Sequence, residues 1–375
     1  MTMINGKKRF SIGLMGLMML IAAPALASDA YGNPFEDSGF VNQDWQVVCD
    51  NTLTCRAAGY ADENAYEMPA SILITANPKE QVKTAEIQLP PEVSSADEYD
   101  VELWLNDKFF GQLTAGPQGT YELNEKQALS LFKRAQQNTK IEIAVVSDIG
   151  SDRWQISDKG MASVLLKLDE VQGRVGTPLA LVSEKVSINN PNRQTPKSLK
   201  SKPIIKRGYA YPDKLNKKLD AKTSAYFQTN MDKWVKSSIN RDDVSECDAL
   251  SGDNSWYDDT DSRKWRFQPI NQRYTLAEHL CWRGAYNTGF GYWVIDNKQP
   301  SQPTLITTKG SGYTDGEILA AHKGRGLGDC WGIERWQWNG ENFVRSYKAT
   351  RGLCRSFAGG AWGLPTYVSE VVEPK

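Results

Sequence analysis

Two histidines, His279 and His322, are the imidazole bases on which a catalytic triad or dyad in this chain would depend. His279 lies in a stretch where apolar and polar residues alternate, and this pattern predicts a surface position on a strand. No nucleophile–base constellation stands out around either histidine. The sequence therefore predicts no catalytic residues and no cofactor; whether the protein is an enzyme stays open, with a non-catalytic role favoured.

The most unusual segment for binding chemistry follows His322 and reads KGRGLGDC, residues 323–330. Its alternate glycines let a ligand approach the backbone closely, and its lysine and arginine attract anions. It matches neither common phosphate-binding pattern. Two interpretations stay open: a glycine-rich turn held by Cys330, or a contact with an anion or a glycan. The candidate binding residues are Lys323, Arg325, Asp329, Trp331, Arg283 and Tyr286.

The amino-terminal segment has the features of a secretory signal. Lys7, Lys8 and Arg9 precede an apolar run, and Ala25-Leu26-Ala27 supplies the small residues that a signal peptidase reads. The apolar run holds roughly 15 residues, fewer than the ~20 needed to cross a bilayer. We predict a signal peptide at residues 1–27 with cleavage near Ala27. The mature protein is then periplasmic or secreted, without a transmembrane anchor.

Export determines how the six cysteines are interpreted, because thiols outside the cytosol tend to pair. The even number leaves none over, although spacing suggests a pairing without establishing it. A structural zinc site is disfavoured, since the chain has no C-x-x-C pair and few imidazole ligands. We therefore predict no metal and three disulfides: Cys49–Cys55, Cys247–Cys281 and Cys330–Cys354.

Composition limits the class of protein. Hydrophobic residues make up 40% and charged residues 24%, as in globular proteins, and the formal net charge is −1. A nucleic-acid binder that neutralises phosphates would carry a clear basic excess, so we predict no nucleic-acid partner. The length exceeds that of one usual hydrophobic core and predicts two domains.

The first predicted domain, residues 36–182, has α+β character, a sheet or sandwich with two helices. Periods of two predict strands at residues 45–48, from 56, 71–75, 84–89, 101–105, 108–113, 141–145 and 152–156. Asn124 and Gln127 match a capping box at the start of a helix of about three turns. Ser157 or Asp158 caps a second helix, which Gly173 ends.

The amino-acid composition changes after residue 182. Residues 183–222 are basic and contain prolines, which predicts an extended, solvated linker. Residues 223–370 hold nine of the twelve tryptophans and, after a possible helix at 230–237, short strand-like runs. These runs predict a mainly antiparallel β domain with disulfides. Its clearest hairpin has Trp336 and Trp338 on one face and Asn339-Gly340 as a two-residue turn.

Several stretches resemble domain-of-unknown-function family 1176, a family of exported bacterial proteins. They are DWQVVCDNTLTCRAAGY at 44–60, ASVLLKLDEVQGRVGTPLALV at 162–182, CWRGAYN at 281–287, KGRGLGDC at 323–330 and WQWNGENF at 336–343. This resemblance implies no catalytic residues, since that family has no established activity. The first half is also similar to the invasion-associated locus B family, through Trp45 and the cysteines at 49 and 55. It lacks that family's second cysteine pair.

These observations favour a non-catalytic cell-envelope binding protein. Its partner is then an envelope glycan, a peptidoglycan fragment or a protein. One alternative is a cell-wall or glycan hydrolase that uses carboxylates, and another is a periplasmic inhibitor of a lysozyme-like enzyme. Release of muropeptides would favour the hydrolase, and protection of cell walls against lysozyme would favour the inhibitor.

Overall fold

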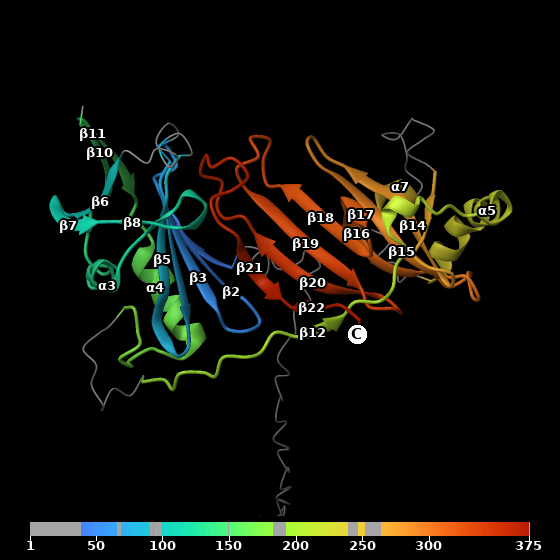
Figure 1. Cartoon of the computed structure of the whole chain (residues 1–375), viewed down its shortest axis with the longest axis horizontal. Coiled ribbons are helices and arrows are strands. Elements are labelled where there is room, and N and C mark those ends of the chain that lie inside the picture. Colours follow the sequence, from blue (N-terminus) through green and yellow to red (C-terminus); the bar gives the residue numbers. More distant parts are fainter. Residues whose placement is uncertain are drawn as a thin grey trace, which may run out of the picture. The chain divides into compact units, whose positions relative to one another are not determined.

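The structure is a computed structural model that describes residues 39–65, 69–90, 93, 99–148, 150–182, 193–238, 247–251 and 264–374. The predicted signal peptide lies outside these residues. The described chain is mostly β-strand with few helices, and its sheets are largely antiparallel (Figure 1). The β-rich character is thus confirmed, while the division into two domains stays a prediction. Within the described part, no helix combines the length and apolar character needed to cross a membrane.

The first sheet begins with a disulfide-closed hairpin. β2 (Trp45–Cys49) pairs with β3 (Cys55–Tyr60), and Cys49 lies opposite Cys55 and is bonded to it. The Asp50 carboxylate organises the turn by accepting hydrogen bonds from the backbone and hydroxyl of Thr52. The sheet has the order β1-β2-β3-β4-β5-β9-β8, with β1 (Phe40–Asn42), β4 (Ser71–Asn77), β5 (Glu80–Gln88), β8 (Thr114–Ala115) and β9 (Tyr121–Glu122).

A second sheet packs its apolar side into the same core. Val101, Leu103 and Leu105 are buried there, as their spacing predicted. Asn106 and Asp107 both have positive φ and form the predicted hairpin turn. The sheet has the order β11-β10-β6-β7, with β6 (Asp100–Leu105), β7 (Lys108–Gln112), β10 (Ile141–Ser147) and β11 (Gly150–Ile156).

Two helices, α3 (Glu125–Phe132) and α4 (Met161–Gln172), belong to the described part of this half. α3 follows a short 3₁₀ turn, Pro117–Gly119, and has the predicted capping box; it is shorter than three turns. α4 ends at Gly173 in the left-handed conformation, as predicted. The predicted cap at Ser157 or Asp158 is wrong, because Gly160 takes that position and the Asp158 carboxylate instead accepts the Thr139 N–H.

The segment predicted as a linker is extended but not a free tether. β12 (Ile204–Lys206) pairs in parallel with β22 (Glu370–Val372). The Lys200 N–H donates to the Thr52 carbonyl, and the Gly208 N–H donates to the Trp338 carbonyl. These backbone bonds dock residues 200–208 on strands that are distant in sequence. A 3₁₀ turn (Asp213–Leu215), α5 (Ala221–Ser238) and α7 (Asp248–Ser251) follow, so the helix expected at 230–237 begins earlier.

The last part is built from two antiparallel sheets that share a core. Tyr292 and Val294 from one sheet pack with Ile318, Trp336 and Trp338 from the other. The four-stranded sheet holds β13 (Arg266–Pro269), β14 (Tyr274–Arg283), β15 (Thr288–Asp296) and β16 (Thr304–Gly310) in that order. The five-stranded sheet holds β17 (Gly312–Thr314), β18 (Glu317–Lys323), β19 (Trp331–Trp338), β20 (Phe343–Thr350) and β21 (Leu364–Val368) in that order.

The β19–β20 hairpin forms as predicted, and both tryptophans named for it are buried. Its turn differs from the prediction. Trp338 lies opposite Phe343, so the turn has four residues, 339–342, in place of two. The Asn339 side-chain oxygen accepts the N–H groups of Glu341 and Asn342, and these bonds favour the longer turn.

The structure holds the three predicted disulfides, including Cys247–Cys281 and Cys330–Cys354. The loop between β20 and β21 also contacts the first sheet. The Trp362 Nε1–H donates to the Ser71 hydroxyl at 2.7 Å, and Arg355 pairs with Asp44 at 2.9 Å. Trp362 and Tyr60 belong to one small buried cluster. Residues far apart in the chain thus pack together around this loop.

Candidate functional site

The inner face of the five-stranded sheet changes from apolar to polar along its strands. On β18 the buried Ile318 and Ala320 are followed two residues later by His322. On β19 the buried Trp336 is followed, in the direction of the same sheet end, by Glu334. Residues two apart on a strand share a face. The face that packs against the four-stranded sheet at Ile318 and Trp336 therefore carries polar side chains further along the same strands.

Strand register places the polar side chains in two neighbouring rows. Ala320, Glu334 and Lys348 lie opposite one another on β18, β19 and β20. The adjacent row contains His322, Gly332 and Thr350. Directly opposed residues of antiparallel strands point to the same face. One sheet face therefore presents an imidazole, a carboxylate and an ammonium group close together.

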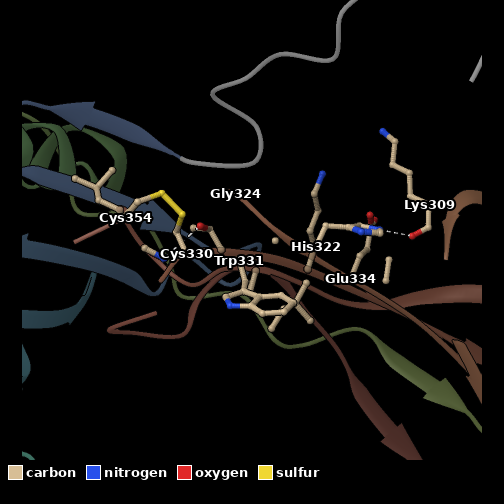
Figure 2. A pocket seen from close by; sticks show the side chains of 15 residues that line it. Lys309, His322, Gly324, Cys330, Trp331, Glu334 and Cys354 are labelled. Carbon is tan, nitrogen blue, oxygen red and sulfur yellow. Dashed lines mark hydrogen bonds between the residues drawn. A yellow bond between two sulfur atoms is a disulfide. The ribbon is translucent and has the colours of Figure 1, made fainter. Parts of the chain in front are cut away.

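This face forms the floor of a hollow of about 400 Å³ (Figure 2). A second hollow of about 220 Å³ shares Lys309 and Glu334 with it. We call the two together the groove. Its larger part is lined by Lys309, Ala320, His322, Gly324, Cys330, Trp331, Gly332, Ile333, Glu334, Lys348, Ala349, Thr350, Gly352, Leu353 and Cys354. The smaller part adds residues 305–308, Trp336 and Arg345.

His322 links the two sheets across the groove. Its Nε2 lies 2.7 Å from the backbone carbonyl oxygen of Lys309 on β16, which Figure 2 marks with a dashed line. A carbonyl accepts, so Nε2 carries the proton and donates it. The imidazole also packs on the Trp282 indole, with 5.1 Å between the ring centroids. Position and orientation of the imidazole are therefore fixed before any ligand arrives.

The charges of the groove are unequal. Among the described residues that line it, Lys309, Arg345 and Lys348 are cationic and Glu334 is the carboxylate. Arg345 Nε and Glu334 Oε1 form an ion pair at 2.5 Å. Lys309 is exposed, and its ammonium has no ion pair with any described residue. The groove is thus electropositive on a chain whose formal net charge is −1.

The predicted binding residues divide into those in the groove and those behind it. Trp331 lines the groove, and the Lys323 ammonium lies 5.5 Å from the centre of its ring. Arg325 and Asp329 form an ion pair instead of lining the groove; Arg325 Nε donates to Asp329 at 2.7 Å. The Ser356 N–H donates to the same carboxylate. This pair therefore holds the glycine-rich turn to the loop after β20.

The environment of Asp329 explains its charge. Burial raises the pKa of this carboxyl, but the hydrogen bonds from Arg325 and from the Ser356 N–H outweigh burial and leave the pKa below its ordinary value. Asp329 is 1% exposed. It is consequently ionised at neutral pH and committed to its two partners.

Tyr286 also meets the glycine-rich segment. Its hydroxyl donates to the Gly324 carbonyl at 3.2 Å, and Asn287 exchanges hydrogen bonds with the backbone N–H and carbonyl of Lys323. Arg283 ends β14 in an exposed position, outside the lining of the groove. The structure thus brings Tyr286 to the turn and places Arg283 elsewhere on the same hairpin.

His279 does not lie on the surface, and that prediction is wrong. The side chain is buried at 3% exposure, and its ring centroid lies 4.7 Å from that of Trp265. Its Nδ1 lies 2.6 Å from the Leu280 carbonyl oxygen. Trp265, fourteen residues earlier in the chain, covers the face of β14 on which His279 lies. The alternating sequence pattern had predicted that this face is exposed to solvent.

One cluster of metal-type donors is found among the described residues: Asp329, Cys330 and Cys354. The two sulfur atoms are joined in a disulfide and offer no thiolate. This cluster is therefore not a fitting metal site.

Sequence reasoning missed Lys309, Glu334 and Lys348. A signal for Glu334 was present, because β19 places this charge two residues from the buried Trp336, on the same face. Lys309 gave no such signal, since it reaches the groove from the other sheet.

Comparison with known proteins gives one result. Searches of the curated proteins and of the solved structures found no match to the chain. The similarity to the invasion-associated locus B family stays a prediction. The family described as "Protein of unknown function (DUF1176)" matches residues 40–369, a span that contains every strand from β1 to β21 and thus the whole groove. The chain therefore belongs to the DUF1176 family.

Proposed function

We propose that this protein is an exported, non-catalytic cell-envelope binding protein and that the groove is its binding site. The ligand is an envelope glycan, a peptidoglycan fragment or a protein partner. One observation carries the proposal: the inner face of β18–β20 turns polar next to β16 of the four-stranded sheet, and it is hollowed there. Ligand sites combine such a concave surface with a few fixed polar groups.

Fixed groove walls support binding. The Cys330–Cys354 disulfide lines one side, and the bond between His322 and the Lys309 carbonyl joins the two sheets at the other. A pre-ordered site loses less conformational entropy when it binds. A ligand of this groove therefore meets walls that are already in position.

The groove chemistry favours binding over catalysis. The Nε2–H of His322 is already donated to a carbonyl, and the Glu334 carboxylate already pairs with Arg345. General acid–base chemistry needs a titratable group within reach of the substrate proton. The carboxylate of the groove is thus already engaged by Arg345.

The location is part of the proposal. Three disulfides fit an oxidising compartment, and the amino-terminal sequence fits an export signal cleaved near Ala27. We place the mature protein in the periplasm or outside the cell. We also retain the two-domain plan, with residues 36–182 and 223–370 as the domains.

The test fills the groove without disturbing the fold. Gly332 lies in the row of His322, and a Cβ atom built on it meets no atom within 4 Å. Gly332→Phe should therefore fold normally and lose binding to purified peptidoglycan sacculi by about tenfold or more in a pull-down. Gly312→Phe is the matched control, because Gly312 on β17 has equal open space and lies outside the groove.

Equal binding by the two variants and the unmodified protein would contradict the proposed site. Release of soluble muropeptides during the same incubation would contradict the non-catalytic role. Circular dichroism of each variant verifies that lost binding does not reflect lost structure.

A further inference from the structure

We infer that the groove recognises a carboxylate of a peptidoglycan fragment and that Lys309 is its principal contact. This inference rests on the proposed function and names the ligand chemistry of the same site. Peptidoglycan supplies carboxylates from two sources: the side chains and ends of its stem peptides, and the lactyl groups of muramic acid units from which the stem peptide has been removed. The charge, position and surroundings of Lys309 carry the argument.

Charge complementarity favours an anion. The lining residues of the groove carry three cationic side chains against one carboxylate, and the ion pair of Arg345 with Glu334 neutralises one cation. Lys348 lies opposite Glu334 in the strand register and is not without an interaction partner, whereas Lys309 has no ion pair with a described residue. Lys309 is therefore the cation whose charge is least compensated by the described residues. A bound carboxylate would supply the missing partner.

Lys309 also lies at the junction of both hollows. Its backbone carbonyl is held by His322, while its side chain extends away from that contact (Figure 2). The root of the side chain is thus fixed, and the exposed side chain borders both hollows. It can reach an anion in either hollow.

The remaining wall fits the body of such a ligand. Ala320, Leu353 and the Cys330–Cys354 disulfide line the larger hollow together with the cations, whereas Trp331 and Ile333 belong to the rows that point to the other face of the sheet. Apolar walls beside a cation suit a ligand with a charged group on a partly apolar body. A muropeptide has this character, with sugar rings and alkyl side chains next to carboxylates. The arginine fork that would bind a phosphate bidentately is not free in this groove, because Arg345 is paired with Glu334.

The first experiment compares untreated sacculi with sacculi whose carboxylates have been converted to neutral amides with a carbodiimide and ammonia. The unmodified protein should bind amidated sacculi about tenfold more weakly, because a charge-assisted hydrogen bond contributes of that order. Equal binding to both would overturn the inference and leave the proposed function standing. Binding to neither would contradict the proposed function itself.

The second experiment changes Lys309. Lys309→Gln should bind untreated sacculi about tenfold more weakly and amidated sacculi as the unmodified protein does, whereas Lys309→Arg should retain most binding. Lys126→Gln, an exposed lysine on α3, is the matched control and should bind normally. An equal loss in both glutamine variants would overturn the assignment to Lys309.

Two further probes identify the carboxylate. Amidase digestion yields glycan strands with free lactyl carboxylates, and it releases the stem peptides separately. Binding to the strands that Lys309→Gln weakens assigns the lactyl group, and binding to the peptides that it weakens assigns the stem peptide. Competition by neither product, together with competition by inorganic phosphate, would overturn the carboxylate in favour of a phosphate ligand.

Discussion

Two aspartate–arginine pairs hold loops in this protein, and they differ in depth. Asp169 and Arg174 are both fully buried, and Asp169 also accepts the N–H groups of Leu181 and Val182. Asp329 is buried too, but the side chain of its partner Arg325 is 39% exposed. Each carboxylate thus ties a short turn to a segment further along the chain, one inside a core and one beside the groove.

The two aspartates respond oppositely to their surroundings. Burial raises the pKa of Asp169 by more than Arg174 and the two N–H groups lower it. At Asp329 burial also raises the pKa, but the hydrogen bonds prevail and the pKa is lowered. Burial therefore prevails at Asp169 and disfavours its ionised form. The hydrogen bonds prevail at Asp329 and favour its ionised form.

The first prediction removes the deeper arginine. Arg174→Met should lower the free energy of unfolding by about 3 to 5 kcal/mol, since it leaves the Asp169 carboxylate buried without its partner. Its loss also frees the carbonyls of Asn77 and Glu80, which Arg174 now contacts. Urea unfolding measures this change. A loss smaller than that of Arg325→Met would break the comparison.

The second prediction concerns the disulfide next to Asp329. Replacing both Cys330 and Cys354 by serine should lower the free energy of unfolding by about 3 kcal/mol, as expected for a loop of this length. The bond spans 24 positions in sequence. Thermal unfolding under non-reducing conditions measures the effect. An unchanged melting temperature would show that the Asp329 contacts alone hold the turn.

Third, Asp329→Asn should lower the free energy of unfolding by about 1 to 3 kcal/mol, because it weakens the charged hydrogen bonds from Arg325 and the Ser356 N–H. A double-mutant cycle with Arg325→Met separates the ion pair from the backbone contact. Full additivity of the two substitutions would contradict a direct interaction.

The fourth prediction follows from the lowered pKa of Asp329. The folded pKa lies below the unfolded value of about 3.9, so the unfolded chain binds the proton first as the pH falls. The stabilisation is then complete well above pH ~4 and is lost as the pH falls through the folded pKa. The difference in unfolding free energy between the unmodified protein and Asp329→Asn should therefore shrink in acid. A constant difference from neutral to acid pH would refute this assignment.

The smallest effect is expected at Lys309. Lys309→Gln should change the free energy of unfolding by no more than about 0.5 kcal/mol, because its ammonium has no ion pair with a described residue. Differential scanning fluorimetry measures this. A clear destabilisation would indicate a structural role, in contrast to the role in binding inferred above.

Features determined by neighbours in sequence were predictable. The Cys49–Cys55 hairpin, the Asn124 capping box and the left-handed Gly173 each depend on residues a few positions apart. The β-rich character followed likewise from the short alternating runs.

Features that depend on how sheets cover one another were not predictable from one sequence. His279 is buried because Trp265 packs on it, and the alternating pattern contains no trace of that cover. The groove lies between β16 of the four-stranded sheet and β18–β20 of its partner, a meeting of strands that one sequence does not show. Trp331 was named from the unusual segment beside it, whereas Lys309 reaches the groove from another sheet.

Tyr60 on β3 stands directly behind one wall of the groove. Its hydroxyl accepts the Leu353 N–H at 3.3 Å, and a side chain at Gly352 would collide with it. Gly352 and Leu353 both line the groove. A fragment that contained only β13–β22 would keep the charged strands of the groove but lose the contact of Tyr60 with Gly352 and Leu353. Tyr60 thus supports a wall of the groove although it lies more than two hundred positions away in the chain from the residues that would touch a ligand.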